Sequence, residues 1–345
     1  MSFLNLITHY SLPITIFFAY LLDLILGDPR WLPHPVRWIG RDISFLEDKI
    51  RRFMKIPLFP PFSKGEMRCS PLSQRGVGGI LEKIGGIFLF IIIVGTVFGL
   101  VWVLLYFSFL ISYFSFLILS VFIAYVSLSI KSLKDEALSV TSAVENISIV
   151  EARKRLKNIV GRDTVNLSKD EIYRAVTETI AENTSDGIIA PLFYLALGGP
   201  ALALAYKAVN TLDSMVGYKN EKYKNLGWFS ARMDDIVNFI PARITAILMV
   251  FASFILRFNW RNSLKIIWRD ARKHPSPNAG FPEAAIAGAL GLQLGGTNYY
   301  FGAPHHRPLI GDEKTGFTSE SVSNTVKIMH LTAFIGVCML LLFWL

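Results

Sequence analysis

The chain has 345 residues, of which 52% are hydrophobic and only 18% are charged. Soluble domains carry about 25% charged residues, so this composition excludes an ordinary soluble domain. The formal net charge is +9, and because no zinc-finger or RNA-binding motif accompanies it, we expect the basic residues to contact membrane lipid and not nucleic acid.

Apolar segments along the chain predict membrane helices. Residues 87–130 contain no charged side chain, and as a helix they would be about 66 Å long, enough to cross a ~30 Å hydrocarbon core twice. We therefore predict a hairpin that turns near residues 107–115. The other apolar segments are residues 4–26, 188–206, 236–256 and 326–345. The pattern predicts an all-α polytopic membrane protein with about five to six hydrophobic helices joined by cytoplasmic helical loops.

The loops near the start of the chain are basic. Residues 27–86 hold eleven Lys and Arg against six Asp and Glu, whereas the turn of the hairpin holds neither type. The positive-inside rule therefore places residues 27–86 and 131–187 in the cytoplasm. Proline and glycine punctuate residues 55–86, which predicts a flexible insertion within a single domain of residues 1–345.

Residues 131–187 have a soluble, helical pattern. Ser168 followed by Glu171 is a capping-box signal that opens a helix over residues 169–182. Glu178 and Glu182 are four residues apart and therefore share one face of this helix. The next apolar segment is interrupted by a Gly-Gly-Pro sequence at residues 198–200, which predicts a kinked or broken helix.

Four polar clusters lie at the ends of the apolar segments, where charged groups are usually kept for chemistry or transport. The first surrounds His34, which two prolines hold on a rigid turn, although an interfacial loop that caps a helix is the alternative. The second, residues 178–187, has three carboxylates and an amide, which suits Mg²⁺. The third runs from Lys207 to Arg243, and the partner of Arg243 would be a bound phosphate or Asp235. The fourth is the turn at residues 274–278.

Motifs spread over nearly the whole chain carry a resemblance to a known family. They occupy residues 22–29, 33–40, 182–187, 190–194, 206–217, 231–235, 241–243 and 276–280. With these motifs in this order, the chain resembles the CobD/CbiB family, the membrane adenosylcobinamide-phosphate synthases of cobalamin biosynthesis. The resemblance implies a multi-pass protein of the cell membrane that joins aminopropanol phosphate to the free propionate of adenosylcobyric acid. It also implies ATP and Mg²⁺, although no Walker A or other standard nucleotide motif occurs.

The motif residues receive roles on this basis. The catalytic candidates are His34, as general base, with Glu182 and Asp186. The candidates for binding substrate or phosphate are Arg30, Arg37, Lys207, Asn210, Arg232, Arg243, Ser276 and Asn278. The metal-ligand candidates are Glu178, Asp213, Asp234 and Asp235. We expect Asp213 and Asp235 to converge with Glu182 and Asp186 on one cation–phosphate site, because clustered carboxylates repel one another unless a cation lies between them.

Two other functions fit the same residues. A membrane phospho- or prenyl-phosphate transferase also places aspartates at the membrane edge, although no paired Asp-x-x-x-Asp motif on one helix supports it. A corrinoid transporter would use a broken helix such as the one predicted at residues 198–200, although no inverted repeat is visible.

Overall fold

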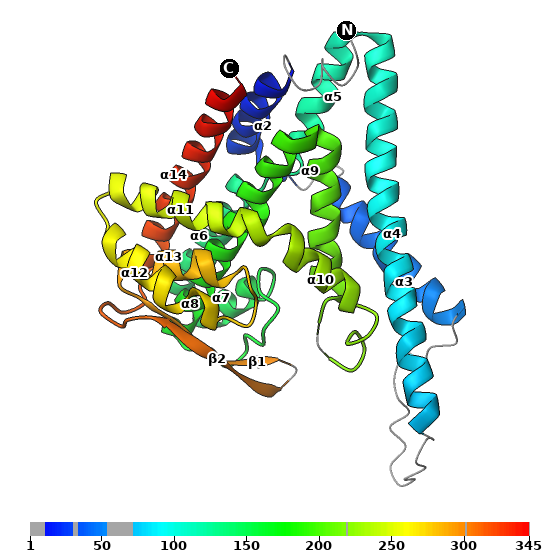
Figure 1. Cartoon of the computed structure of the whole chain (residues 1–345). Helices are drawn as coiled ribbons and strands as arrows, with labels where there is room; N and C mark the ends of the chain where they lie inside the picture. The colour runs from blue at the N-terminus through cyan, green and yellow to red at the C-terminus, as the bar shows by residue number, and fades with distance from the viewer. Residues whose placement is uncertain (1–10, 30–33, 54–71, 219, 301, 345) are drawn as a thin grey trace.

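The computed structural model describes residues 11–29, 34–53, 72–218, 220–300 and 302–344, apart from the side chains of residues 72–77. Long helices run alongside one another, and a β-hairpin lies at one end of the molecule, away from the two termini (Figure 1). The helices are α2 (Leu12–Leu26), α3 (Pro35–Phe53), α4 (Leu72–Ile111), α5 (Tyr113–Tyr125), α6 (Ile130–Asn146), α7 (Ile149–Leu156), α8 (Lys169–Thr184), η1 (Ser185–Ile189), α9 (Ala190–Val216), α10 (Trp228–Val237), α11 (Phe239–Ile255), α12 (Trp260–Asp270), η2 (Ala271–Lys273), α13 (Gly280–Leu290) and α14 (Ser319–Trp344), and the strands are β1 (Gln293–Tyr300) and β2 (Ala303–Gly311).

The predicted all-α polytopic fold is confirmed. The described residues contain four helices long and apolar enough to cross a membrane, or five if the bent pair α10–α11 counts as one span. Helix α4 has large apolar side chains on its surface, among them Ile91 and Leu100, which are 57% and 58% exposed. Such a surface suits lipid and not water, because soluble monomers rarely expose contiguous apolar patches of this kind.

The predicted hairpin of apolar helices turns where the sequence placed it. Helix α4 ends at Ile111 and α5 begins at Tyr113, with Ser112 between them as N-cap. The Ser115 backbone N–H donates to the Ser112 hydroxyl at 3.0 Å, which satisfies one of the free amides at the start of α5.

Helices α8 and α9 form the central column of the molecule. The predicted capping box is present, since Glu171 N–H donates to Ser168 and the Glu171 carboxylate accepts from the Ser168 N–H. One turn of π-helix, η1, joins α8 to α9. The predicted break also occurs: Gly198 and Gly199 leave the helical conformation, and Gly199 has a φ of 72° that favours glycine.

The β-hairpin was not predicted from the sequence, which indicated only a glycine-rich loop. Strands β1 and β2 are antiparallel, and a register shift lies between Leu294 and Gly296. Gly295 and Gly296 have φ of 92° and 86°, so the irregularity uses residues that adopt positive φ readily. Leu294 and Ile310 are fully buried and attach the hairpin to the core formed with α12 and α13.

Part of the predicted flexible insertion is helical. Residues 72–86 form the start of α4, while residues 55–71 lie outside the described residues. Glu82 accepts a hydrogen bond from Asn225 at 2.9 Å, and a Cβ at Gly86 would lie 1.9 Å from the Leu226 carbonyl oxygen. Gly86 therefore allows α4 to approach the loop before α10 closely.

Candidate functional site

A cavity of about 1240 Å³ brings three of the four polar clusters together. Its wall includes His34 and Arg37 after α2, Asn183 on α8 and Lys207 on α9. Helices α6 and α7 contribute charged and hydroxyl side chains to the wall, which are Lys131, Ser132, Asp135, Glu136, Ser139, Glu151, Lys154 and Arg155. A cavity of this size, lined by both polar and aliphatic side chains, suits a large ligand that carries polar groups.

His34 is buried in this wall and is paired with Asp28. Its Nε2 lies 3.1 Å from Asp28 Oδ1, and its Nδ1 accepts the backbone N–H of Val36 at 3.3 Å. Burial alone would raise the pKa of Asp28, but the hydrogen bonds from His34 and Ser132 and the charge of Lys207 hold it below its ordinary value. The ionised carboxylate therefore fixes the orientation of the imidazole, as it does for a general base, and the lone pair of Nδ1 faces the Val36 N–H.

Asp23, in the same sequence cluster, has a structural position. Its side chain is fully buried, and its Oδ2 accepts the backbone N–H groups of Ile130 at 2.7 Å and Lys131 at 3.3 Å. Asp23 thus caps the start of α6 and joins it to α2.

A second group of polar side chains joins η1, α9 and α10. The Asn210 amide nitrogen lies 3.5 Å from Asp186 Oδ2 and 3.4 Å from Asp234 Oδ1, so one amide connects both carboxylates. Asp213 lies within electrostatic range of both, and Lys207 within range of Asp186. Asp234, and not Asp235, is therefore the acid that shares Asn210 with Asp186.

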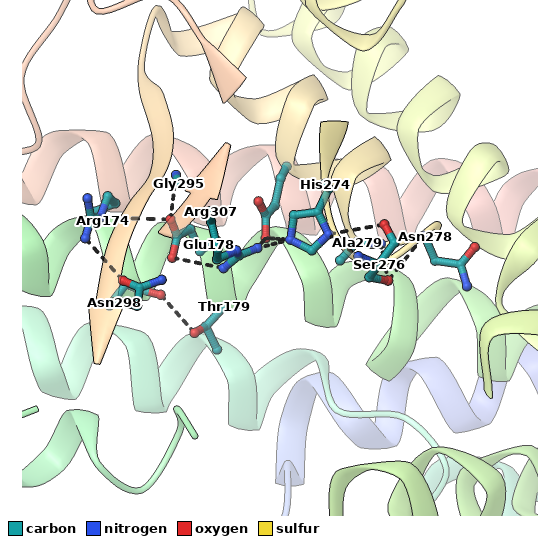
Figure 2. Close-up of polar contacts among 12 residues, drawn as sticks. Arg174, Glu178, Thr179, His274, Ser276, Asn278, Ala279, Gly295, Asn298 and Arg307 are labelled. Atoms are coloured by element: carbon teal, nitrogen blue, oxygen red, sulfur yellow. Dashed lines mark hydrogen bonds and ion pairs between the residues drawn. The ribbon is translucent and has the colours of Figure 1, made fainter. Parts of the chain in front are cut away.

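Glu178 belongs to a buried ion-pair network. Its carboxylate pairs with Arg162. It also lies 3.8 Å from Arg307 NH1 and 4.0 Å from Arg174 Nε, and it accepts the Gly295 N–H at 3.0 Å (Figure 2). Guanidinium and amide groups thus contact its oxygens in this structure, and its predicted role as a metal ligand stays a prediction.

Arg307 extends this network towards His274 and Glu283. It donates to Glu283 Oε1 at 3.0 Å. It also contacts the His274 ring (Figure 2). Burial and the Arg307 charge lower the pKa of His274 to about 4. Burial raises the pKa of Glu283 to about 7, although Arg307 opposes this shift. Glu182, whose side chain is exposed, lies within electrostatic range of these three residues.

Arg243, at the end of the third cluster, contacts the turn that forms the fourth cluster. Arg243 donates to Phe239 O at 2.6 Å, to Asn278 Oδ1 at 3.1 Å and to Pro277 O at 3.2 Å. Its guanidinium also lies over the rings of Phe239 and Phe281. These contacts give Arg243 a structural role, and its predicted role in binding phosphate stays a prediction.

Ser276 and Asn278 shape the turn before α13. Ser276 Oγ accepts the backbone N–H groups of Asn278 and Ala279, each at 3.3 Å (Figure 2). The Asn278 amide donates to the Asp235 carbonyl oxygen at 2.8 Å, which joins the turn to α10. These contacts give both side chains a structural role, and their predicted binding of substrate stays a prediction.

The remaining candidates are dispersed. Arg37 is exposed at the cavity, Arg232 is exposed on α10, and Arg30 lies outside the described residues. Among the residues that the structure describes, no group of three or more His, Cys, Asp or Glu side chains is arranged to hold a metal ion. The four residues predicted as metal ligands therefore do not form one metal cage.

Sequence reasoning missed two arginines that hold the ion-pair network together. They are Arg162 and Arg307, and neither received a role from the sequence. In the sequence both arginines lie within polar segments. Arginines on a protein surface lie in such segments too, so this position does not distinguish them.

Comparison with known proteins places the chain among relatives of similar length. The family model described as CobD/Cbib protein matches residues 16–329. "Cobalamin biosynthesis protein CobD" of Clostridium perfringens is 45% identical over 329 residues, which are 95% of this chain and 97% of that protein. "Cobalamin biosynthesis protein CbiB" of Salmonella typhimurium is 42% identical over 323 residues, 94% of each chain. No solved structure matches.

Proposed function

The chain belongs to the CobD/CbiB family, which gives it a role in cobalamin biosynthesis, and from this premise we propose that it is the amide-forming enzyme of the cell membrane. The proposed reaction joins aminopropanol phosphate to the free propionate of adenosylcobyric acid. The observation that supports it most is the cavity of about 1240 Å³, which combines His34, Lys207 and Asn183 from three separate motifs. A corrinoid is a large ligand with many amide groups, and this polar cavity has the volume to receive much of one.

The chemistry requires an activated carboxylate and a deprotonated amine. A carboxylate does not react with an amine at neutral pH, so its oxygen must first become a leaving group. ATP, when bound, would supply a phosphoryl group for this activation. The amine nitrogen then forms the amide bond as inorganic phosphate leaves, and one proton is released.

The residues of the cavity provide for each requirement. His34, oriented by Asp28, is the proposed acceptor of the amine proton, which it would take at Nδ1 when the substrate amine displaces the 3.3 Å contact from the Val36 N–H. Lys207 and Arg37 contribute positive charge for the propionate and phosphate groups.

Asp186 and Asp234 fit a Mg²⁺ ion better than the predicted four-residue set does. Mg²⁺ is usually held by one or two carboxylates while it keeps water and phosphate oxygens. Two carboxylates that share one Asn210 amide satisfy that requirement. In the proposed enzyme this pair would hold Mg²⁺, which would screen the phosphate charge.

The test is an assay of the purified protein in nanodiscs. Adenosylcobyric acid, aminopropanol phosphate, ATP and Mg²⁺ are supplied, and the corrinoid product is identified by its mass. We expect formation of adenosylcobinamide phosphate, and its loss in a His34→Ala variant that remains inserted in the membrane.

Two other outcomes would reject the proposal. Turnover of a polyprenyl phosphate without any corrinoid amide would indicate a transferase. Movement of adenosylcobyric acid into liposomes without amide formation would indicate a transporter.

A further inference from the structure

A second cavity, separate from the site above, lies where α14 meets α2, α6 and α11. It forms an open groove of about 610 Å³. Phe334 and Leu138 at its edge are 51% and 36% exposed, so the groove opens on the side of the helical bundle. Its apolar lining consists of Tyr20, Leu138, Leu256, Val326, Leu331 and Phe334.

One part of this groove is basic. Lys134, Lys327 and His330 line it together with the apolar residues. His330 Nε2 is buried and has no hydrogen-bond partner among the described residues. Asp135 lies within electrostatic range of His330, but it pairs with Lys131 at 2.7 Å and so leaves the charges of Lys134 and Lys327 in excess.

The basic residues also lie next to the apolar parts of candidate membrane spans. Lys327 and His330 are in the first half of α14, a candidate membrane span, and the residues that follow them are apolar up to its end. Lys134 lies near the start of α6, in the segment that continues from the apolar α5. Basic side chains at the ends of membrane helices attract anionic lipid.

We propose that this groove binds one anionic phospholipid, whose phosphate contacts Lys134, Lys327 and His330 and whose acyl chain lies against Val326 and Phe334. Both parts of the groove are used by this ligand. A free phosphate would make no contact with the apolar lining. A zwitterionic lipid has no net negative charge to oppose the two lysines.

The experiment measures lipids retained by the purified full-length chain. Native mass spectrometry in detergent compares added phosphatidylglycerol, phosphatidylcholine and glycerol 3-phosphate. The test variant is Lys134→Gln with Lys327→Gln. The matched control is Lys157→Gln with Lys265→Gln, which removes two exposed lysines outside the groove.

We expect phosphatidylglycerol to bind one per chain and more tightly than phosphatidylcholine. Its affinity should fall about five-fold for each lysine removed and about thirty-fold for both, while the control pair changes it less than about two-fold. Retained helical circular dichroism verifies that each variant is folded.

Three results would overturn the inference. They are equal binding of the two lipids, an equal loss in the test and control variants, and binding of glycerol 3-phosphate as tight as that of the lipid. The last result would indicate a phosphate site without a lipid. None of these readings depends on amide synthesis, so the proposed enzyme activity stands or fails separately.

Discussion

Replacement of Glu178 by glutamine should strongly destabilise the folded protein. The Glu178 side chain is 3% exposed and faces the guanidinium groups of Arg162, Arg307 and Arg174. Glutamine keeps the shape and can still accept the Gly295 N–H, so the change removes mainly the negative charge. Loss of one partner of a buried ion pair costs about 3–5 kcal/mol, because the opposite charge is left buried without compensation.

Equilibrium unfolding by SDS in mixed micelles, followed by circular dichroism, measures this cost. The matched control is Glu313→Gln, since Glu313 is exposed just after β2. A surface change of this kind should alter the free energy of unfolding by less than about 0.5 kcal/mol. The double change Glu178→Gln with Arg307→Gln should be less destabilising than the sum of the single changes, by about 1 kcal/mol or more, because the two side chains interact.

Two results would refute this reasoning. The first is unfolding of Glu178→Gln and Glu313→Gln at the same SDS fraction. The second is additivity of the two single changes, which would mean that the network contributes packing and not charge pairing.

Three further predictions concern other parts of the molecule. His34→Ala should lower the rate of amide formation about 100-fold, whereas His305→Ala on the exposed hairpin should leave it unchanged; equal rates would exclude His34 as the base. The pKa of Glu283 is raised from 4.5 to about 7, so this carboxyl keeps its proton in the folded chain after the unfolded chain has lost it. Its contribution to stability is therefore present below pH 4.5 and is lost as the pH rises through 7. In the same unfolding assay, the free energy of unfolding of Glu283→Gln relative to that of the native chain should rise between pH 5 and 8, and parallel pH profiles would contradict this. Gly86→Ala should destabilise by about 1–3 kcal/mol, since its Cβ would lie 1.9 Å from a carbonyl oxygen, whereas Gly95→Ala has nothing within 4 Å and should not destabilise.

Much of the helical fold could be predicted from local sequence. The uncharged residues 87–130 required burial in lipid, and their turn at Ser112 lies inside the predicted range. Likewise, the Ser168 capping box and the glycines at the break in α9 act on residues only a few positions away. In each case the determining interaction is local in sequence, so it can be predicted from one sequence.

The candidate site was predicted only in part. Residues of the separate motifs around His34, Asn183 and Lys207 do line one cavity. In contrast, the partners of Glu178 and Arg243 could not be read from spacing. Asn278, which accepts from Arg243, is 35 residues away along the chain, and Gly295, which donates to Glu178, is 117 residues away.

The sequence by itself determined that this is a membrane protein of long helices, because hydrophobicity and backbone hydrogen bonding in lipid leave few alternatives. Tertiary structure alone decided which charges meet. The β-hairpin brings Arg307 against Glu178 and Glu283, and its own shape depends on strand pairing across Leu294 and Ile310. Whether a carboxylate binds an arginine, an amide or a cation depends on the groups that packing brings within about 4 Å of it, since Coulomb interactions in a buried site far exceed those in water. Residue type alone does not carry that information.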